Sequence, residues 1–538
     1  MSTSSEAPDS STAGPRRPRL SLATLSLVLF LTFLDNTIIS VTLANVQSDL
    51  HTGVSALQWV VGAYALVFAS LMLPAGAISD RIGRKKVMLA GVAVFCVGSV
   101  IGALANNVEM LWAARAVMGV GAAASEPGTL SMIRHLYTER RERAEALGVW
   151  AAISGLALAA GPVIGGALVG VWSWRAVFWF NVFFGLVALV GAIVVLPENA
   201  DPTRRASDLG GYALGIAGTA CATFATIAGE TSGYRTSWVV LLFVIAGVLL
   251  AGFVLVERRA ANPMLDVRFF RLGAFAGSNF VAFATYFAVF SIFFFVSLYL
   301  EEVGSQSGYS IALDFLPMAV VMVVASTLTG RWVAAMGPRV PMAVGCVLGC
   351  GGVVATALLV NPSSSMGTLG WALGLAGLGF GITVVPVTSV ALNVIPPQHS
   401  GMAASATNTS RELGALAGVA VLGSVVNGQL TVDLLRRLAA LGIPQQFRHL
   451  VVTAVITGSI GSQASSAEKN KAISAIVNKV VGAAYGAFSN GLDLALGISA
   501  GLLFLAAVAS LGWIRRPSPE QAASLGIPLA GLSEASRR

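Results

Sequence analysis

The stretch LSLATLSLVLFLTFLDNTIISVTLA, from Leu20 to Ala44, holds one ionisable side chain, Asp35, among apolar and small polar residues. A helix rises about 1.5 Å per residue, so this stretch can cross a bilayer with Asp35 about 22 Å along it. An acid at that depth costs roughly 2.5–3.5 kcal/mol on insertion scales, so it should face protein or a water-filled cavity. The stretch predicts a membrane helix whose acid exchanges protons; the alternative is an Asp that only caps or packs a bent helix.

The whole chain has the same apolar character. Of its 538 residues, 56% are hydrophobic and 11% are charged, whereas soluble proteins carry about 25% charged residues. The 59 glycines suit closely packed membrane helices. The composition indicates an all-α polytopic membrane protein in contact with lipid. The four cysteines lie in apolar stretches without a neighbouring histidine or acid, so we expect neither a metal site nor a cofactor.

Fourteen stretches are candidate transmembrane helices: 20–44, 56–78, 87–105, 109–131, 145–169, 177–196, 209–229, 237–256, 274–300, 311–333, 341–360, 367–393, 402–427 and 491–514. Most of the 33 Lys and Arg residues fall in connections on one side, while Arg175 and Arg235 lie in short connections on the other. The positive-inside rule therefore places both termini in the cytoplasm. It also accounts for the net charge of +8 without a nucleic-acid partner.

An internal repeat indicates the domain organisation. Four residues of the connection at 76–91 recur at a constant offset: Gly76, Gly83, Met88 and Gly91 match Gly330, Gly337, Met342 and Gly345. This predicts two related six-helix bundles, residues 20–196 and 274–514, with two linking helices at 209–256.

Three segments are expected outside the membrane. Residues 1–19 should be a disordered cytoplasmic tail without a cleavable signal peptide, and residues 515–538 a second cytoplasmic tail. The external segment 428–490 carries apolar helical faces, such as Leu430, Leu434 and Leu438, and is expected to form short amphipathic helices on the outer surface.

The turn GAISDRIGRKK, residues 76–86, combines flexible glycines with charged residues. Gly76 and Gly83 permit a tight turn, and Asp80 can meet Arg84 or the positive N-terminus of a neighbouring helix. Such a contact can lock one conformation and release in another. We therefore interpret Gly76, Asp80, Arg81, Gly83 and Arg84 as a conformational latch rather than as an ordinary charged turn.

Further charges lie inside the predicted spans. Arg115, in LWAARAVMGVG, reaches a depth similar to that of Asp35 and can pair with it or adjust its proton affinity. The alternative for Arg115 is a structural role on backbone carbonyls. Glu412 lies near the middle of its span beside Arg411, and Glu126 precedes Pro127. Asp35, Arg115, Glu126 and Glu412 are the candidate proton-coupling residues; for Glu412 a static pair with Arg411 is equally open.

The run GPVIGG, residues 161–166, places Pro162 between glycines. Pro162 removes a backbone hydrogen bond and bends its helix, while Gly161, Gly165 and Gly166 permit close approach of another helix. A generic kink is the alternative.

Together these motifs resemble the major facilitator superfamily and, within it, the fourteen-helix drug:proton antiporters (EmrB/QacA-like). The cytoplasmic turn, the Arg115 motif and the GPVIGG run resemble signatures of the superfamily. Longer matches include WSWR at 172–175, NPMLDVRFF at 262–270 and NTSRELG at 408–414. Two departures are Phe183, where the family has Pro, and uncharged Met322, where some members have an acid tied to divalent organic cations.

The resemblance implies a secondary transporter rather than an enzyme, acting as a monomer in a bacterial plasma membrane. It would export lipophilic, often cationic drugs in exchange for protons by alternating access. No GxxxxGK[ST] loop for ATP is present. Two alternatives remain: an exporter of an endogenous metabolite or self-made antibiotic, and an uncoupled membrane sensor or lipid-handling protein on the same fold.

Overall fold

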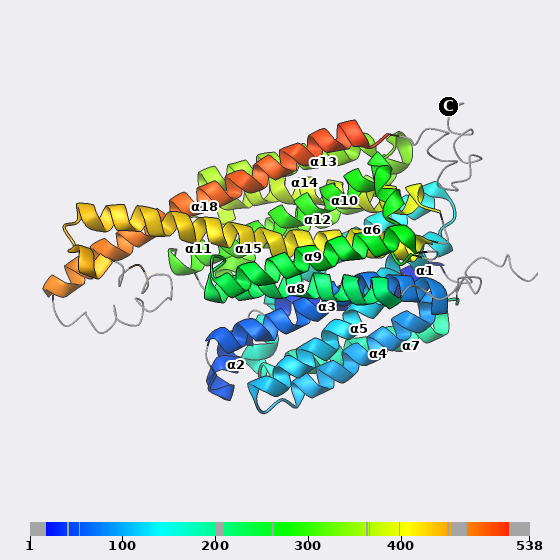
Figure 1. Ribbon diagram of the computed structural model, residues 1–538, viewed down its shortest axis with the longest axis horizontal. Helices are drawn as coiled ribbons and strands as arrows, with labels where there is room; N and C mark the ends of the chain where they lie inside the picture. Colours follow the sequence, from blue (N-terminus) through cyan, green and yellow to red (C-terminus); the bar gives the residue numbers. More distant parts are fainter. Residues whose placement is uncertain are drawn as a thin grey trace, which may run out of the picture.

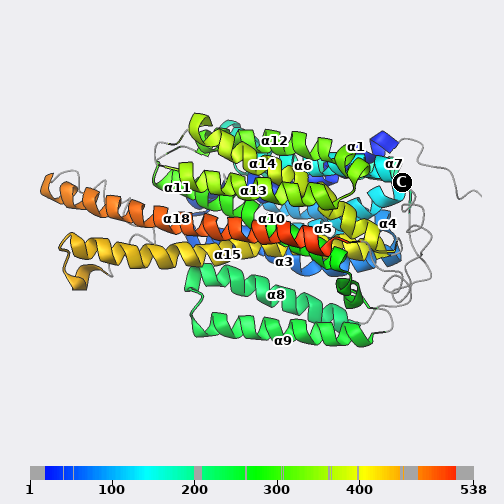
Figure 2. The same cartoon turned by 90° about the horizontal axis from the view of Figure 1, so that it is seen from above.

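The computed structural model describes residues 18–39, 42–52, 54–198, 209–260, 263–304, 306, 308–361, 364, 366–396, 399–448, 452 and 471–515. The regular elements within these ranges are all helices. The long ones run side by side (Figures 1 and 2). This arrangement suits a lipid environment, where a helix satisfies its backbone hydrogen bonds within one segment. Most of the two predicted tails, residues 1–17 and 516–538, lies outside the described residues, and the last two residues of the predicted N-terminal tail belong to helix.

Each predicted span coincides with a helix or a run of helices. These are α1 (Pro18–Ile38), α3 (Val54–Ile82), α4 (Arg84–Ala103), α5 (Val108–Leu136), α6 (Arg140–Val171), α7 (Arg175–Val195), α8 (Leu209–Ser232), α9 (Ser237–Arg259), α10 (Gly273–Ser291) continued by η4 (Ile292–Val296) and α11 (Ser297–Glu302), α12 (Gly308–Met336), α13 (Arg339–Leu359), α14 (Met366–Val394), α15 (Ser400–Ala440) and α18 (Lys471–Trp513). Two short helices, α2 (Leu43–Leu50) and η3 (Val267–Arg271), lie between them.

Twelve helical stretches in the described ranges are long and apolar enough to cross a membrane. The two predicted spans outside this set are α5 and α6. In α5, charged and small residues, including Arg115 and Glu126, lower the hydropathy. Both nevertheless pack against other long helices of the bundle.

The first predicted span is too long at its C-terminal end. The helix α1 ends at Ile38 rather than at Ala44, and α2 follows as a separate element. The reason is a turn in which the amide and the hydroxyl of Thr42 both donate to the carbonyl of Ile39, at 3.0 and 2.7 Å. The 21 residues of α1 still span about 31 Å, enough for the hydrocarbon core of a bilayer.

The helices form two groups that meet along two seams. The N-terminal group comprises α1 and α3–α7, and the C-terminal group comprises α10, α12–α15 and α18. Between the groups, α6 packs on α12 and α3 packs on α15. The pair α8–α9 lies outside the groups, with α8 against α3 and α15, and therefore covers one of the two seams (Figure 2).

Repeat-related glycines occupy equivalent places in these seams. A Cβ on Gly76 of α3 would lie 2.8 Å from the carbonyl oxygen of Gly401 in α15. A Cβ on Gly330 of α12 would lie 3.0 Å from the carbonyl carbon of Ala144 in α6. At both positions only glycine permits the backbones to approach this closely.

The segment 428–490, predicted to form short helices on the outer surface, is built differently. Most of its described residues continue α15 and α18, which project together beyond the other helices (Figure 1), and residues 445–448 form a separate helical turn. The predicted apolar face on 430–438 is used as the core of this helical hairpin, whose buried residues are Leu430, Leu434, Leu438, Val452, Val480, Ala483, Ala484 and Ala487. The apolar stripes pair with each other rather than with the bundle surface.

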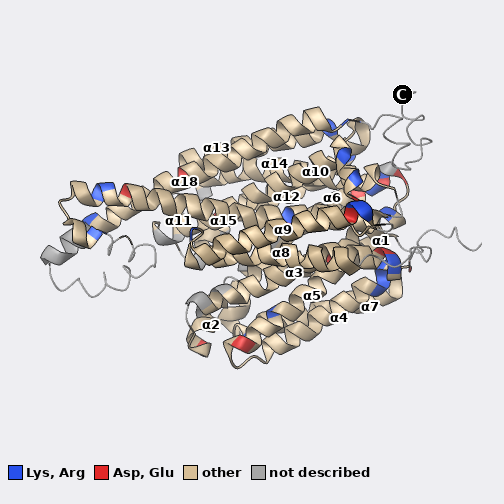
Figure 3. Ribbon diagram, in the orientation of Figure 1, with Lys and Arg blue, Asp and Glu red and all other residues tan. Residues whose placement is uncertain are grey.

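The two ends of the bundle differ in charge. We call the end where α1 begins and α18 ends the terminal end, and the opposite one the hairpin end. Lys and Arg gather at the terminal end, whereas the middle of the bundle carries few charges (Figure 3). A core of buried apolar side chains runs through both helix groups.

Candidate functional site

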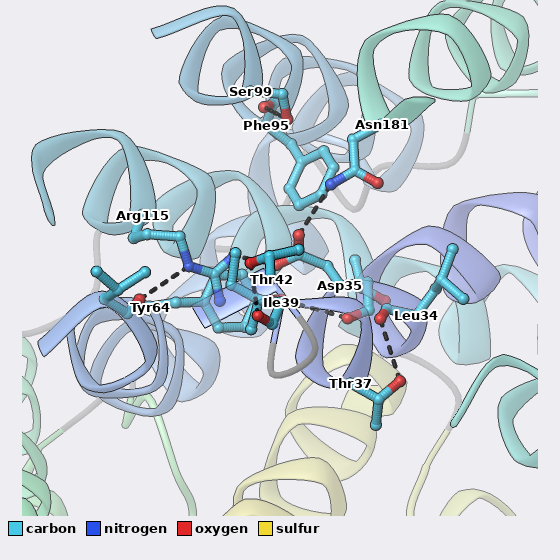
Figure 4. A network of polar contacts seen from close by, with 12 residues as sticks. Leu34, Asp35, Thr37, Ile39, Thr42, Tyr64, Phe95, Ser99, Arg115 and Asn181 are labelled. Carbon is cyan, nitrogen blue, oxygen red and sulfur yellow. Dashed lines mark hydrogen bonds and ion pairs between the residues drawn. The ribbon is translucent and has the colours of Figure 1, made fainter. Parts of the chain in front are cut away.

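Asp35 lies at the centre of a buried polar network in the N-terminal group (Figure 4). Its Oδ2 accepts a hydrogen bond from Arg115 Nη1 at 2.5 Å, and its Oδ1 accepts one from Asn181 Nδ2 at 2.8 Å. All three side chains have 0% exposure. Because they come from α1, α5 and α7, the carboxylate joins three helices.

The other contacts of Arg115 extend the network to α3. Its Nε donates to the carbonyl of Val60 at 3.0 Å, and its guanidinium lies 4.5 Å from the centre of the Tyr64 ring. The Tyr64 hydroxyl donates to the carbonyl of Thr32 at 3.5 Å. A proton on Asp35 would remove the one carboxylate paired with Arg115 and leave a buried cation. Proton binding here is therefore linked to the packing of these helices.

The predicted pairing of Arg115 with Asp35 is present, whereas the parts played by Asn181 and Tyr64 were not predicted. A signal for Asn181 existed in the sequence. Apart from Arg175 at its start, Asn181 is the one polar side chain of α7. Tyr64 gives no such signal, because a tyrosine in an apolar helix usually only packs.

A second polar cluster lies where the two helix groups meet. Arg411 of α15 donates from Nη1 to Asn408 Oδ1 at 3.0 Å and from Nη2 to Thr388 Oγ1 at 2.5 Å. Its guanidinium lies 5.2 Å from the Trp150 ring centre and 5.5 Å from that of Tyr286. Trp150 belongs to the N-terminal group, so this arginine bridges the groups.

Glu126 and Glu412 belong to the same cluster. Each interacts electrostatically with Arg411, and Glu126 also with Glu412. Within the described residues, however, neither carboxyl forms an ion pair or a hydrogen bond. The static Arg411–Glu412 pair considered from the sequence is absent. The network of Asp35 and this cluster are separate, although Tyr64 interacts electrostatically with charged side chains of both.

At the terminal end, Asp80 forms both of the contacts considered for it. Its Oδ1 accepts hydrogen bonds from Arg84 Nε and Nη2 at 3.1 and 3.0 Å. The amides of Gly401 and Met402, in the first turn of α15, donate to Oδ1 and Oδ2, each at 3.0 Å. A carboxylate at a helix N-terminus is favoured by the free amides and the helix dipole. Asp80 therefore connects the two helix groups.

The remaining residues of the predicted latch have different surroundings. Gly83 lies between α3 and α4 with φ at 126°, a conformation that favours glycine. Arg81 is exposed, which separates it from the buried Asp80–Arg84 pair. Two further inter-group bonds, which the sequence did not predict, reinforce this end. The hydroxyls of Ser131 and Ser400 lie 2.8 Å apart, and Arg134 Nη2 donates to the carbonyl of Ile395 at 2.8 Å.

The predicted close approach at the GPVIGG run is present at its first residue. A Cβ on Gly161 would lie 2.8 Å from Thr37 Cβ and 2.9 Å from the amide nitrogen of Ile38, both on α1. Gly165 is buried, but Gly166 is exposed and nothing lies within 4 Å of an added Cβ. Pro162 lies inside α6. Gly161 is therefore the contact position of the run.

No group of three or more His, Cys, Asp or Glu side chains suited to a metal ion occurs among the residues that the structure describes. The four cysteines are free thiols on apolar helices.

Comparison with known proteins identifies the class of transporter. Residues 25–419 match the family model of the Major Facilitator Superfamily. The chain therefore belongs to this superfamily of membrane transport proteins. The human organic anion transporter MFSD10 shares the fold, with a TM-score of 0.63, 15% sequence identity, and coverage of 92% of this chain and 99% of that one.

Relatives within the superfamily are drug transporters. A methylenomycin A resistance protein of Bacillus subtilis is 33% identical over 76% of this chain and 87% of the relative. The drug efflux pump JefA of Mycobacterium tuberculosis is 30% identical over 93% of this chain and 98% of the relative. The chain is a member of this drug-efflux and drug-resistance branch of the superfamily.

Proposed function

We propose that this transporter exports lipophilic, often cationic compounds from a bacterial cell in exchange for protons. Relatives named for drug efflux and antibiotic resistance support the export of drugs. The observation that carries proton coupling is the fully buried Asp35, held by Arg115 and Asn181 where no solvent reaches it. A titratable group in this position can link protonation to helix movement.

In the proposed cycle, protonation of Asp35 removes its charge and weakens its bond to Arg115. Helices α1, α5 and α7 are then free to shift against one another. Substrate binds between the two helix groups, near Glu126 and Glu412, and the groups rock about it. Moving one charge through the membrane potential supplies about 2.3 kcal/mol per 100 mV.

The latch would act between states rather than on the substrate. In the conformation described, Asp80 holds the first turn of α15 and closes the terminal end. Opening that end requires these two hydrogen bonds to break. Substrate could therefore enter from that side only after the hydrogen bonds between Asp80 and α15 have broken. Arg84 would remain paired with the freed carboxylate.

The proposed topology has fourteen crossings, with α5 and α6 added to the twelve strongly apolar stretches. The terminal end would face the cytoplasm, because Lys and Arg gather there (Figure 3). The chain would act as a monomer with three membrane parts: two six-helix bundles at 20–196 and 274–514, and a linking pair at 209–256.

A second candidate is a dedicated exporter of one antibiotic or metabolite. One relative is named for resistance to a single compound, methylenomycin A. The two candidates share the coupling mechanism and differ in the breadth of compounds carried.

The test is transport by the purified chain in liposomes with an imposed pH gradient. A panel of lipophilic cations, neutral drugs and acidic antibiotics should show uphill movement of several compounds, abolished by a protonophore. Uphill movement of one compound alone would favour the dedicated exporter. Proton-independent movement, or binding without movement of any compound, would contradict coupled export and favour an uncoupled or sensing protein.

A further inference from the structure

Arg411 is a buried cation that forms no ion pair with a carboxylate among the described residues. It is 2% exposed, and both of its hydrogen bonds go to uncharged groups, Asn408 and Thr388. Its Nε has no hydrogen-bond partner. An arginine stays protonated in proteins, so a full positive charge is fixed at the meeting of the two helix groups.

The guanidinium is held in place rather than mobile. Asn408 lies one turn before it on α15, and Thr388 reaches it from α14. The rings of Trp150 on α6 and Tyr286 on α10 lie near the guanidinium. Each contact favours the cation without neutralising it. Neutralisation must come from elsewhere in the cluster.

Two carboxyls supply the opposing charge. Glu126 of α5 and Glu412 of α15 interact electrostatically with Arg411, and neither has an ion-pair partner among the described residues. The other titratable groups that interact with these carboxyls are the phenols of Tyr286 and Tyr64, both neutral near pH 7. Asp35 and Arg115 do not alter the balance, because their charges cancel within their own pair.

The charges of the cluster can then be counted. With both glutamates ionised, Arg411 cancels one of the two negative charges, and one negative charge remains. Buried charge is tolerated only where it is compensated, so this remainder calls for a single positive charge. Either one proton or one monovalent cation provides it. A bivalent cation would leave the cluster with an excess positive charge.

We propose that Arg411 sets the valence of the transported cation, by reserving one of the two carboxylates and leaving a place for one exchangeable positive charge. The inference rests on the proposed function and adds the residue that selects the substrate. Arg411 acts through charge balance at a site between the helix groups. This means of selecting substrates is separate from the absence of an acid at position 322, which is Met322.

The test compares Arg411→Gln with Arg411→Lys. Glutamine can hydrogen-bond to Asn408 and Thr388 but carries no charge, whereas lysine keeps the charge with a different shape. The probes are a monovalent and a bivalent quaternary ammonium compound with matched apolar parts. Their uphill transport is measured in the same liposomes under one pH gradient.

The wild type and Arg411→Lys should prefer the monovalent probe. In Arg411→Gln the ratio of bivalent to monovalent transport should rise by about tenfold, equivalent to about 1.4 kcal/mol. The number of protons released on binding the bivalent probe should also rise. An unchanged ratio in Arg411→Gln, or the same rise in Arg411→Lys, would overturn the proposal.

A charge-compensated variant covers the case in which Arg411→Gln does not insert. Arg411→Gln combined with Glu412→Gln restores the original net charge. Because Glu412 belongs to the proposed site, the readout for this variant is binding of the two probes rather than transport, and binding should keep the monovalent preference. A bivalent preference in this double variant would overturn the proposal. Failure of the proposed function looks different, because the wild type itself would then show no proton-driven transport of either probe.

Discussion

A carboxylate without access to solvent needs either a proton or a cation beside it, and the surroundings of Asp35 allow both. Arg115 provides the cation, and Asn181 provides a neutral donor that orients the second oxygen. With Asp35 ionised, both carboxylate oxygens are therefore hydrogen-bonded and the charge of Arg115 is balanced. With Asp35 protonated, the guanidinium of Arg115 loses its counter-charge. Protonation of Asp35 therefore favours a movement of α5, the helix that carries Arg115.

Asp35→Asn should abolish export driven by a pH gradient. Asparagine keeps the shape and an acceptor for Arg115, so the variant should still insert, but it cannot titrate. Asp35→Glu should retain part of the activity with a shifted pH dependence. Because coupling is reciprocal, wild-type substrate affinity should weaken as the pH falls.

The measurement is substrate binding and transport side by side in liposomes, with Asp49→Asn as the control. Asp49 is an exposed acid of the short helix α2, and its loss should leave transport intact. If Asp35→Asn still pumps uphill with the proton dependence of the wild type, coupling resides elsewhere, and Glu412 is the first residue to test.

Asp49 itself predicts an acid-dependent stability. The hydrogen bond from Arg175 Nη1, at 2.6 Å, and a second from Trp174 lower the pKa of this carboxyl. A carboxyl whose pKa is lower in the folded state stabilises the fold at pH values above the ordinary carboxyl pKa of about 3.9. This stabilisation is lost as the pH falls through the folded-state pKa.

In detergent, the wild type should therefore melt at a higher temperature than Asp49→Asn near neutral pH, and the difference should shrink as the pH falls below about 4. High salt should shrink it as well, because the pair is partly exposed. A melting-temperature difference that is independent of pH would contradict the role assigned to this pair.

At the scale of elements, the latch joins the end of α3 to the start of α15. Asp80→Asn removes the charge that the α15 amides and Arg84 share, and Arg84→Ala removes the partner that holds Asp80 when α15 leaves. Both variants should insert normally and transport more slowly, with substrate affinity little changed. The measurement is transport rate per inserted molecule, with the exposed Arg81→Ala as control. Wild-type rates in Asp80→Asn would show that the contact is only structural.

Gly161→Leu tests the contact of α6 with α1. The leucine side chain would meet Thr37 and the backbone at Ile38, two and three residues beyond Asp35. Overpacking costs typically about 1–3 kcal/mol in soluble cores. We expect transport to be lost, while Gly166→Leu, at an exposed position with open space, keeps it. Full activity of Gly161→Leu in a dye-efflux assay would disprove the close-packing account.

The sequence predicted those features in which a rare residue type stands in an apolar background. Asp35 and Arg115 are such residues, and their pairing follows because isolated charges in a membrane need each other. The turn after Ile38 was missed because apolar residues continue past it, and only the bonding of Thr42 reveals the break. The partners of Arg411 were missed because Thr388 and Trp150 come near only when α14 and α6 pack around α15.

At the scale of the molecule, the two seams between the helix groups are not equivalent. Gly76 and Gly330 give both seams a close backbone contact, in keeping with the internal repeat. The α3–α15 seam has a buried carboxylate latch, whereas the position that corresponds to Asp80 in α12 is Ala334. The α6–α12 seam has instead an exposed ion pair, between Arg331 and Glu145 at 3.9 Å. The α3–α15 seam is also the one covered by α8 and α9 (Figure 2).

The helix α15 connects the latch, the Arg411 cluster and the helical hairpin. Its first turn is bound by Asp80, its middle carries Arg411 and Glu412, and its last turns form one side of the hairpin. A straight helix of 41 residues is about 60 Å long. If it tilts as a rigid rod by about 5° about Arg411, Ser400 moves by about 1.5 Å and Ala440 by about 4 Å in the opposite direction. The hairpin therefore amplifies small movements at the terminal end, and a fluorescent or spin label near Ala440 would report the opening of that end from the opposite end of the molecule.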